Sequence, residues 1–299
     1  MNILQKYYKN VLRRILKLPV DVPECEILFL AGSLPFEALL HLRILSLFSM
    51  ICNLVDNPLT SIAKSSLLRS RPSSKSWFQM VRNISVQYNL PHPLELLDSP
   101  FPAKRYKTLC KGKIYEYRHS HLVIQCVNLP SLRYLQPCFL SLSRPHPILA
   151  NLSGNPYESR SCHVQVMLLS GCYRTEKLRR HWSTNKEGFC LLPGCKHLKI
   201  VETEEHLLLH CPALVSVRRR LFSRIIEFTA DKTVLQTLLS NLFFQLDDAI
   251  KMQFLLDPST LPAVISAFQT HGDEILAQCF KIGRMWCRSL HDSRLKLMD

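Results

Sequence analysis

A core helix is predicted by one stretch of the chain, Phe36-Glu-Ala-Leu-Leu-His-Leu-Arg-Ile-Leu-Ser-Leu-Phe-Ser-Met-Ile-Cys52. Its apolar residues return every three or four positions, which is the period of an α-helix with one buried face. The turn signal Ala31-Gly-Ser-Leu-Pro35 precedes the stretch, and Asn57-Pro58 follows it. A stretch of this length and period indicates a fold built from helices.

Two further segments have the same period. Residues 3–18 carry apolar residues at helical spacing with Lys and Arg between them, and Pro19 and Pro23 end this basic amphipathic pattern. Residues 76–90 resume helical spacing. We find no internal repeat of the length that marks a solenoid or a propeller. The predicted fold class is therefore mainly α.

The charge of the chain is strongly positive. It has 299 residues, 47% of them hydrophobic, with 38 Lys and Arg against 23 Asp and Glu and a formal charge of +15. Residues 1–150 hold 19 of the basic and 8 of the acidic residues, whereas residues 151–299 hold 19 and 15. So large an excess indicates a polyanionic partner, and it is concentrated in the N-terminal half.

The apolar runs and the cysteines indicate a cellular location. No apolar run approaches the roughly 20 residues that cross a bilayer, so we expect no transmembrane segment. Charged residues spread through the N-terminus leave no apolar core for a secretory signal. We therefore expect a protein that is not secreted and that is cytoplasmic, nuclear or both. Its 12 cysteines should then be thiols rather than a disulfide framework.

Prolines divide the chain. Residues 126–160 contain Pro130, Pro137, Pro145, Pro147 and Pro156 and show no sustained period. We expect four regions: a basic helical region over residues 1–125, an irregular connector over 126–160, a region that holds a Cys/His cluster over 161–228, and a C-terminal helical region over 229–299.

The Cys/His cluster has the spacing of a metal site. Cys190-Leu-Leu-Pro-Gly-Cys195 places two thiols on a short turn, and Glu204-Glu-His206-Leu-Leu-Leu-His-Cys211-Pro212 supplies a His and a third Cys about ten residues later. Thiolate and imidazole are the ligands that zinc prefers in closed tetrahedral sites. We therefore predict one structural Zn²⁺ held by Cys190, Cys195, His206 and Cys211. The alternative is a set of buried thiols without a metal.

The fourth ligand needs an argument. Cys211 lies five residues after His206, about 140° round an unbroken helix, whereas His210 would share the face of His206. The residue before a proline is disfavoured in the α region, so Pro212 can turn Cys211 inward. Thiolate is also the stronger ligand. We favour Cys211 over His210, with His197 as a third choice.

Basic and aromatic side chains flank the cluster on both sides. Such side chains suit a single-stranded nucleic acid, because bases stack on rings and cations follow phosphates. The alternative is that Trp182 anchors the loop and the arginines only face solvent. The candidate nucleic-acid contacts are Arg174, Lys177, Arg179, Arg180, Trp182, Arg218, Arg219 and Arg220.

At this point the sequence resembles a known family. His206-Leu-Leu-Leu-His-Cys-Pro-Ala-Leu214, with the Cys190/Cys195 pair upstream, is similar to the CCHC zinc-binding segment after the reverse transcriptase of non-LTR (LINE-type) retrotransposons. Gly32-Ser-Leu-Pro-Phe-Glu-Ala38 resembles their helical thumb, and Trp286-Cys-Arg-Ser-Leu-His-Asp-Ser-Arg-Leu-Lys-Leu297 their extreme C-terminus. The resemblance implies a thumb-like lobe over residues 1–125, a zinc knuckle, a C-terminal helical lobe, and a polymerase segment of the same element as a further partner.

The catalytic parts of that family are not matched. Its polymerase uses an aromatic-x-Asp-Asp hairpin and a further upstream Asp. The only Asp-Asp here, Asp247-Asp248, follows the zinc motif and lacks that setting, so we interpret it as a surface pair or a helix-terminal feature. Endonuclease, fingers and palm would precede Met1, which implies a C-terminal piece of such a polyprotein. We expect no enzymatic activity.

These expectations lead to a function and two alternatives. The chain is expected to be a zinc-containing fragment that holds RNA or single-stranded DNA. It could instead be a zinc-stabilised helical module that binds protein, because apolar helices with Arg-rich faces serve both uses. A residual RNA-directed DNA polymerase component is the third reading.

Overall fold

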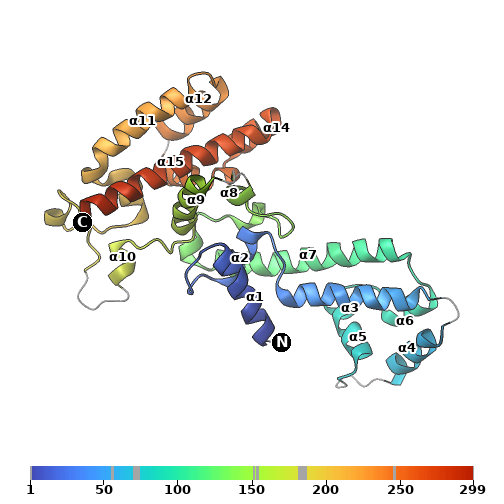
Figure 1. The fold of residues 1–299 in the computed structure, drawn as a ribbon. Helices are drawn as coiled ribbons and strands as arrows, with labels where there is room; N and C mark the ends of the chain where they lie inside the picture. The colour runs from blue at the N-terminus through green and yellow to red at the C-terminus, as the bar shows by residue number, and fades with distance from the viewer. Residues whose placement is uncertain are drawn as a thin grey trace.

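A computed structural model of the chain describes residues 2–54, 57–69, 75–150, 152, 155–180, 187–244 and 247–298 (Figure 1). The chain is mainly α-helical, which confirms the predicted class. No strand forms within the described ranges, where the one isolated bridge is the antiparallel pair Phe189 and Val201.

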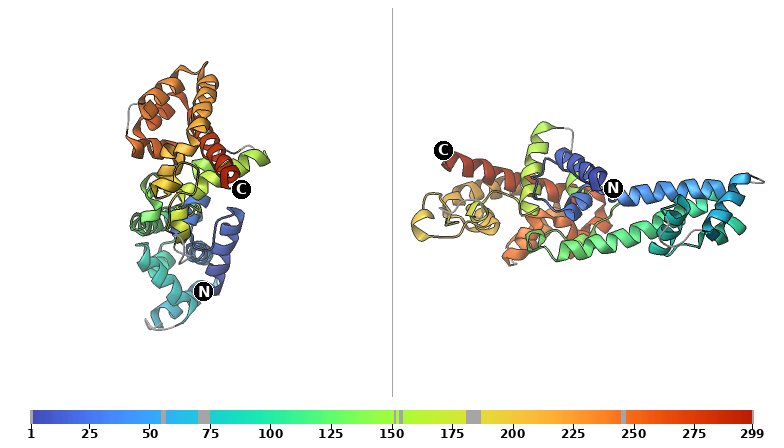
Figure 2. Two further views of the ribbon diagram at one scale, coloured as in Figure 1. Left: turned by 90° about the vertical axis from the view of Figure 1, so that its left-hand side faces the viewer. Right: turned by 90° about the horizontal axis from the view of Figure 1, so that it is seen from below.

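The N-terminal helices form an elongated group. Helices α3 and α7 lie side by side and extend away from the C-terminal helices, with α4, α5 and α6 near their far end (Figures 1 and 2). The stretch predicted as a core helix is α3, with the predicted bounds. The N-terminal helices are α1 (Asn2–Ile15), α2 (Glu24–Ala31), α3 (Phe36–Cys52), α4 (Pro58–Arg69), α5 (Trp77–Gln87), α6 (Pro93–Asp98) and α7 (Ala103–Val127).

The contact between α3 and α7 has an apolar seam and one polar cluster. Ile44, Leu45 and Phe48 of α3 are buried at helical spacing, as are Tyr106, Cys110 and Ile114 of α7. A buried stripe of this period is what holds two helices together. The polar cluster centres on Arg118, whose guanidinium lies 2.6 Å from Glu37 and donates to the Tyr88 hydroxyl.

A close backbone approach links α2 to the connector. Gly32 ends α2 in the left-handed region, with φ of 60°. A Cβ at this position would lie 2.0 Å from the carbonyl of Arg144, so only glycine fits. Two residues later the backbone N–H of His146 donates to the carbonyl of Leu30 at 3.0 Å.

The connector also contacts the C-terminal helices. Apart from α8 (Pro147–Ala150), its described residues between 128 and 155 hold only short turns. His146 and Asp257 are completely buried there, and their side chains meet at 3.3 Å. The buried apolar side chains of both halves belong to one cluster. The connector therefore joins the two groups of helices by packing rather than as a free linker.

The C-terminal helices gather round α15. This helix packs against α9, α11, α13 and α14. At Gly283 of α15 a Cβ would lie 2.4 Å from the Leu255 carbonyl and 2.5 Å from Nε2 of Gln165, so a side chain has no room here. The C-terminal helices are α9 (Pro156–Leu169), α10 (Glu176–Arg179), α11 (Val215–Thr229), α12 (Thr233–Leu239), α13 (Asp248–Leu256), α14 (Pro262–His271) and α15 (Asp273–Met298).

The sequence predicted no transmembrane segment. Of the described helices, none alone has the length and apolar content to cross a bilayer. The pair Glu24–Ala31 and Phe36–Cys52, bent by 60°, meets the length and composition criteria only when taken together.

Candidate metal centre

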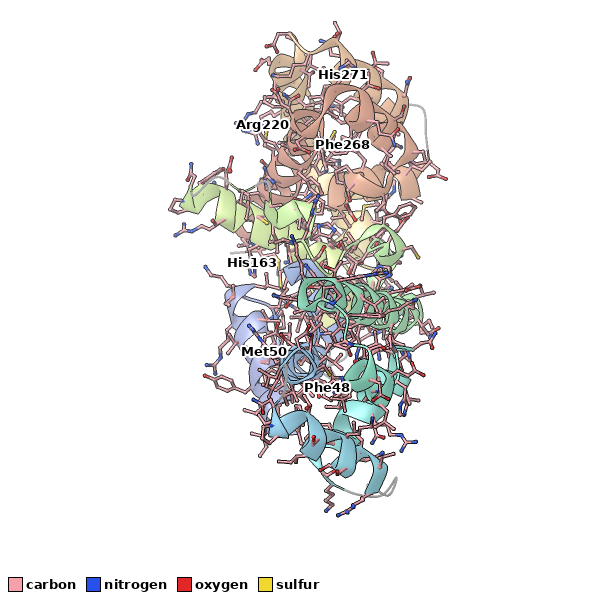
Figure 3. The ribbon with its side chains drawn as sticks, turned by 90° about the vertical axis from the view of Figure 1, so that its right-hand side faces the viewer. Phe48, Met50, His163, Arg220, Phe268 and His271 are labelled. Atoms are coloured by element: carbon pink, nitrogen blue, oxygen red, sulfur yellow. The ribbon has the colours of Figure 1, made fainter. Side chains whose placement is uncertain are left out.

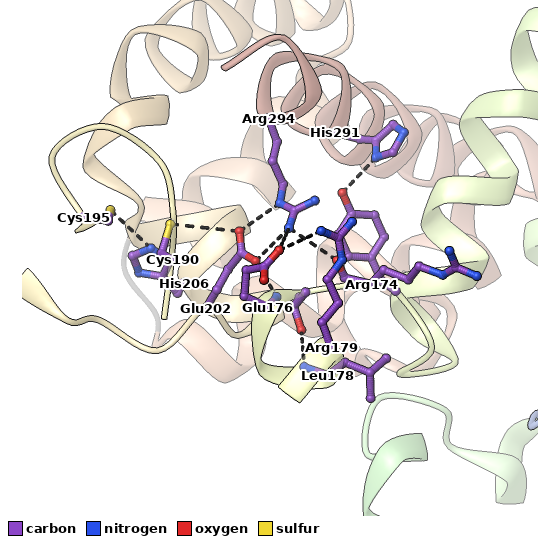
Figure 4. A network of polar contacts seen from close by, with 12 residues as sticks. Arg174, Glu176, Leu178, Arg179, Cys190, Cys195, Glu202, His206, His291 and Arg294 are labelled. Carbon is purple, nitrogen blue, oxygen red and sulfur yellow. Dashed lines mark hydrogen bonds and ion pairs between the residues drawn. The ribbon is translucent and has the colours of Figure 1, made fainter. Parts of the chain in front are cut away.

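Four potential ligands converge in the C-terminal half. The side-chain donor atoms of Cys190, Cys195, His206 and Cys211 all lie within 4.8 Å of one another, and all four residues are buried. The Cys195 sulfur is 3.6 Å from Nε2 of His206 and 3.6 Å from the Cys211 sulfur. The thiols are free, and part of the cluster is visible in Figure 4. This set of donors could hold a metal ion.

The first two ligands are carried by a tight loop. The backbone N–H of Cys190 donates to the Ile200 carbonyl at 2.8 Å, and the backbone N–H of Glu202 donates to the Gly188 carbonyl at 3.0 Å. These two bonds close the loop at its base. Gly194 adopts a φ of 84°, a value that side chains disfavour, directly before Cys195. The turn expected from Pro193-Gly194 therefore brings the two sulfurs together.

The other two ligands depend on a widened helical turn. Residues His206–His210 form a π-helical turn, in which the Cys211 N–H donates to the His206 carbonyl at 2.7 Å. This i to i+5 bond brings Cys211 nearer to the face of His206 than an α-helix would. Cys211 has a ψ of 117°, outside the helical region, as expected before Pro212.

The two alternative histidines lie elsewhere. His210 is 48% exposed, and its Nε2 lies 2.9 Å from Asp248 and 3.8 Å from Glu205. His197 lies exposed in the short turn Lys196–Leu198. The structure therefore brings Cys211, and neither of these histidines, into the cluster.

Neighbouring residues fix the backbone of the ligands. Thr203 accepts a hydrogen bond on its hydroxyl from the His206 N–H at 3.0 Å. Trp286 of α15 donates its indole N–H to the Leu208 carbonyl at 3.1 Å, inside the π-helical turn. These contacts orient the ligand-bearing segments, as outer contacts do in metal proteins.

Arg218 requires a correction. It was predicted as a contact to nucleic acid, but the residue is only 9% exposed, and its side chain donates from Nη2 to the Cys211 carbonyl at 2.7 Å. Burial lowers its pKa, and the neighbouring thiols Cys211 and Cys195 oppose that effect. Arg218 therefore holds Cys211, the fourth candidate ligand, from inside the protein.

A buried ion pair joins the loop to α15. Glu202 accepts hydrogen bonds from Nε and Nη2 of Arg294, each at 2.8 Å, and from the backbone N–H of Glu176 at 2.6 Å (Figure 4). Arg179 in turn lies 2.8 Å from Glu176. The carboxylate of Glu202 is also 4.0 Å from the Cys190 sulfur. The cluster is therefore one part of a larger polar network.

The remaining predicted nucleic-acid contacts fall on two elements. Arg174, Lys177 and Arg180 are exposed at or next to α10, whereas Arg179 is half-buried in its pair with Glu176. Arg219 and Arg220 are exposed on α11. Trp182 lies outside the described residues.

The thiols influence one another electrostatically. The hydrogen-bonding neighbour Cys211 and burial raise the pKa of Cys190 to about 12. Burial also raises the pKa of Cys195. Without a cation these two residues are therefore neutral thiols at neutral pH, and a bound divalent ion would have to displace their protons.

No protein family, curated protein or solved structure matches this chain.

Several supporting residues carry no local sequence signal. Trp286 lies 78 residues from its partner Leu208, and Arg294 lies 92 residues from Glu202, and a single sequence does not pair residues so far apart. Arg218 could have been found, because it lies four residues after the buried Leu214 and three before the buried Leu221, on one helical stripe.

Proposed function

We propose that this chain is a zinc-stabilised, non-catalytic nucleic-acid-binding segment that resembles the C-terminal part of a non-LTR retrotransposon reverse transcriptase and holds RNA or single-stranded DNA. The observation that carries the proposal is the buried Cys190, Cys195, His206 and Cys211 cluster. The retrotransposon resemblance rests on the sequence motifs around it.

The donor geometry fits zinc. Zn–S bonds of about 2.3 Å and Zn–N bonds of about 2.0–2.1 Å on a tetrahedron separate two sulfurs by about 3.8 Å and a sulfur from a nitrogen by about 3.6 Å. The corresponding separations here are 3.6 Å for Cys195 to Cys211 and 3.6 Å for Cys195 to His206. Four protein ligands leave no open position for water, so the ion would be structural.

The surroundings of the cluster also fit a charged centre. Three thiolates and one Zn²⁺ carry a net charge of −1. The guanidinium of Arg218, on the Cys211 carbonyl, supplies a buried positive charge beside it. A buried charge is tolerated when it is paired in this way. Zinc bound here would stabilise the folded loop, because the ligands converge only in the folded chain.

A non-catalytic role is supported by the positions of the acidic pair. Asp247 caps α13 by accepting from the Ile250 N–H at 2.9 Å. Asp248 lies 2.9 Å from both His210 and Lys251. Both carboxylates therefore have structural partners, and neither lies in the strand-turn-strand setting that the polymerase pair requires.

Nucleic-acid binding is supported by charge. The formal charge is +15, and several of the candidate basic residues expose their side chains. Phosphate contacts release counterions, so affinity for single-stranded RNA should fall steeply as salt rises. The proposal includes a location inside the cell, because a reducing compartment keeps cysteines such as the 12 of this chain as thiols.

A fluorescence anisotropy titration tests this function. The full chain loaded with zinc is titrated with a labelled single-stranded RNA over a series of salt concentrations. We expect binding at low salt with a linear loss of log affinity against log salt. Absence of binding at low salt contradicts the proposal. A protein-binding module would show little salt dependence in the binding of its own partner.

A further inference from the structure

A cavity is lined in part by Arg294, whose partner Glu202 contacts the candidate metal centre. Its volume is about 340 Å³. No Asp or Glu is among the residues that line it, although apolar side chains and two histidines are. Its positively charged lining residues are Lys17, Arg160, Arg174, Arg179, Arg288 and Arg294.

The cavity is built from segments far apart in the sequence. Lys17 follows α1, Arg160 belongs to α9, Arg174 precedes α10, and Arg288 belongs to α15. His163, which also lines the cavity, lies between the N-terminal and the C-terminal helices, whereas Arg220 lies among the C-terminal helices (Figure 3). The fold therefore gathers cations that the sequence scatters.

Three of these cations are neutralised within the protein. Arg294 is paired with Glu202 at 2.8 Å, Arg179 with Glu176 at 2.8 Å, and Arg288 with Asp292 at 2.8 Å. These pairs hold their guanidinium groups in place at the cavity wall.

The other three have no such partner. Among the described residues, no ion pair engages Lys17, Arg160 or Arg174, and all three side chains are exposed to solvent at the cavity. The cavity therefore keeps uncompensated positive charge, which is the requirement of an anion site.

Lys17 occupies an unusual backbone conformation. Its φ is 54°, and the surrounding bonds from Lys17 to Arg14 and from Leu18 to Arg13 fix this left-handed turn at the end of α1. Glycine usually fills such a position, and a lysine there costs free energy. These bonds are the usual closing bonds of a helix end, and they fix the point at which the Lys17 side chain leaves the chain after α1.

Two histidines line the cavity, and the pKa of each is lowered. Burial lowers the pKa of His163, and Lys17 lowers it further. Burial is the main cause that lowers the pKa of His291; Asp292 opposes it, and Arg288 and Arg294 add to it. Both imidazoles are therefore neutral near pH 7. The Tyr173 hydroxyl lies 2.8 Å from Nδ1 of His291.

We propose that this cavity binds a backbone phosphate of the single-stranded nucleic acid, with Lys17, Arg160 and Arg174 as its ligands. This inference rests on the proposed function and adds a defined binding position to it. Phosphate recognition by side chains outside the base edges carries no sequence information. Binding at the cavity should therefore be independent of base identity.

The test compares two triple variants of the zinc-loaded full chain. The cavity variant carries Lys17→Gln, Arg160→Gln and Arg174→Gln. The control variant carries Lys75→Gln, Lys104→Gln and Lys107→Gln, which removes the same charge from exposed positions near α5 and on α7. Zinc content and circular dichroism verify that both variants fold.

The readout is the salt dependence of single-stranded RNA binding. Loss of the one phosphate held at the cavity should make the slope of log affinity against log salt shallower by about 0.7 in the cavity variant. The control should keep nearly the original slope. An abasic oligonucleotide should compete with the RNA, and millimolar inorganic phosphate should compete only weakly if the site is built for a polymer backbone.

Each other outcome overturns the inference. If the unaltered chain binds RNA and the two variants have equal slopes, the cavity is not the phosphate site, although the proposed function stands. If inorganic phosphate competes as well as the abasic oligonucleotide, the cavity is a site for the free ion. If the unaltered chain fails to bind RNA at low salt, the proposed function fails and this inference fails with it.

Discussion

Arg294, near the end of α15, makes two parallel hydrogen bonds of 2.8 Å to Glu202, which lies 92 residues earlier and four residues before His206. The side chains are 2% and 1% exposed, so the pair is inside the protein. Paired geometry of this kind is the strongest form of the Arg–carboxylate contact. The last turns of the chain therefore hold the loop that carries the candidate zinc ligands.

Removing one partner of this pair should be costly. Arg294→Met leaves Glu202 buried without its cation, and breaking a buried pair in this way typically costs about 3–5 kcal/mol. Urea unfolding should report a loss of that order. Lys64→Met, which removes an exposed pair with Asp98, should cost less than about 1 kcal/mol.

The double variant Arg294→Met with Glu202→Gln checks the cause. It should recover part of the loss, because no unpaired charge remains inside the protein. A loss below about 1 kcal/mol for Arg294→Met would mean that water reaches Glu202 and that the pair does not hold the loop.

The thiols of the cluster should be required for metal. Cys190→Ser and Cys211→Ser should each reduce bound zinc from one ion per chain toward none, because a hydroxyl is a poor zinc ligand. Cys138→Ser, at an exposed cysteine outside the cluster, is the matched control and should leave zinc unchanged. Elemental analysis of the purified proteins measures all three. Equal zinc content in the three variants would exclude the assigned ligands.

The two histidines of the π-helical turn, His206 and His210, should differ in their effect on zinc binding. His206→Ala should lose the ion, whereas His210→Ala should keep it, because His210 lies outside the cluster with Asp248. The exposed contact between His210 and Asp248 should contribute less than about 1 kcal/mol to the free energy of unfolding. Zinc analysis and thermal unfolding of both variants decide between them. Loss of zinc in His210→Ala, with zinc retained in His206→Ala, would show that His210 and not His206 is the ligand.

A pH effect is expected at Glu26. Burial raises the pKa of this carboxyl from about 4.5 to about 8, so the folded chain holds its proton over a range where the unfolded chain has lost it. The contribution of protonated Glu26 to the free energy of unfolding is complete below the pKa that this carboxyl has in the unfolded chain. It is lost as the pH rises through about 8.

Glu26→Gln removes this dependence. The stability of the variant relative to the unaltered chain should therefore increase with pH between about 5 and 8, by up to about 1.4 kcal/mol per pH unit. Urea unfolding at several pH values measures the difference. A difference that stays constant across this range would show that Glu26 is ionised in the folded chain.

Local patterns in the sequence were sufficient for part of the structure. The apolar period predicted α3 with its observed bounds, and the proline after Cys211 correctly indicated that this residue leaves the helix. Asp247 is a helix-terminal residue, as expected. Each of these features depends on neighbours within a few positions, which a single sequence contains.

Contacts between distant residues, and the face of a helix on which a residue lies, could not be predicted from local patterns. Three consecutive arginines, Arg218–Arg220, have the same composition signal, but one lies on the buried stripe of α11 and two face solvent. The cavity lined by Lys17, Arg160 and Arg174 is assembled only when α9 packs against α15 and the end of α1 reaches them. Such positions follow from helix packing rather than from local spacing.

Zinc K-edge X-ray absorption on the purified full chain tests the central claim most directly, because it counts and identifies the atoms bound to the ion. The account predicts one zinc per chain, with three sulfurs at about 2.3 Å and one nitrogen at about 2.0–2.1 Å and no bound water. A shell of two sulfurs and two nitrogens, a bound water, or a chain that retains no zinc would contradict it.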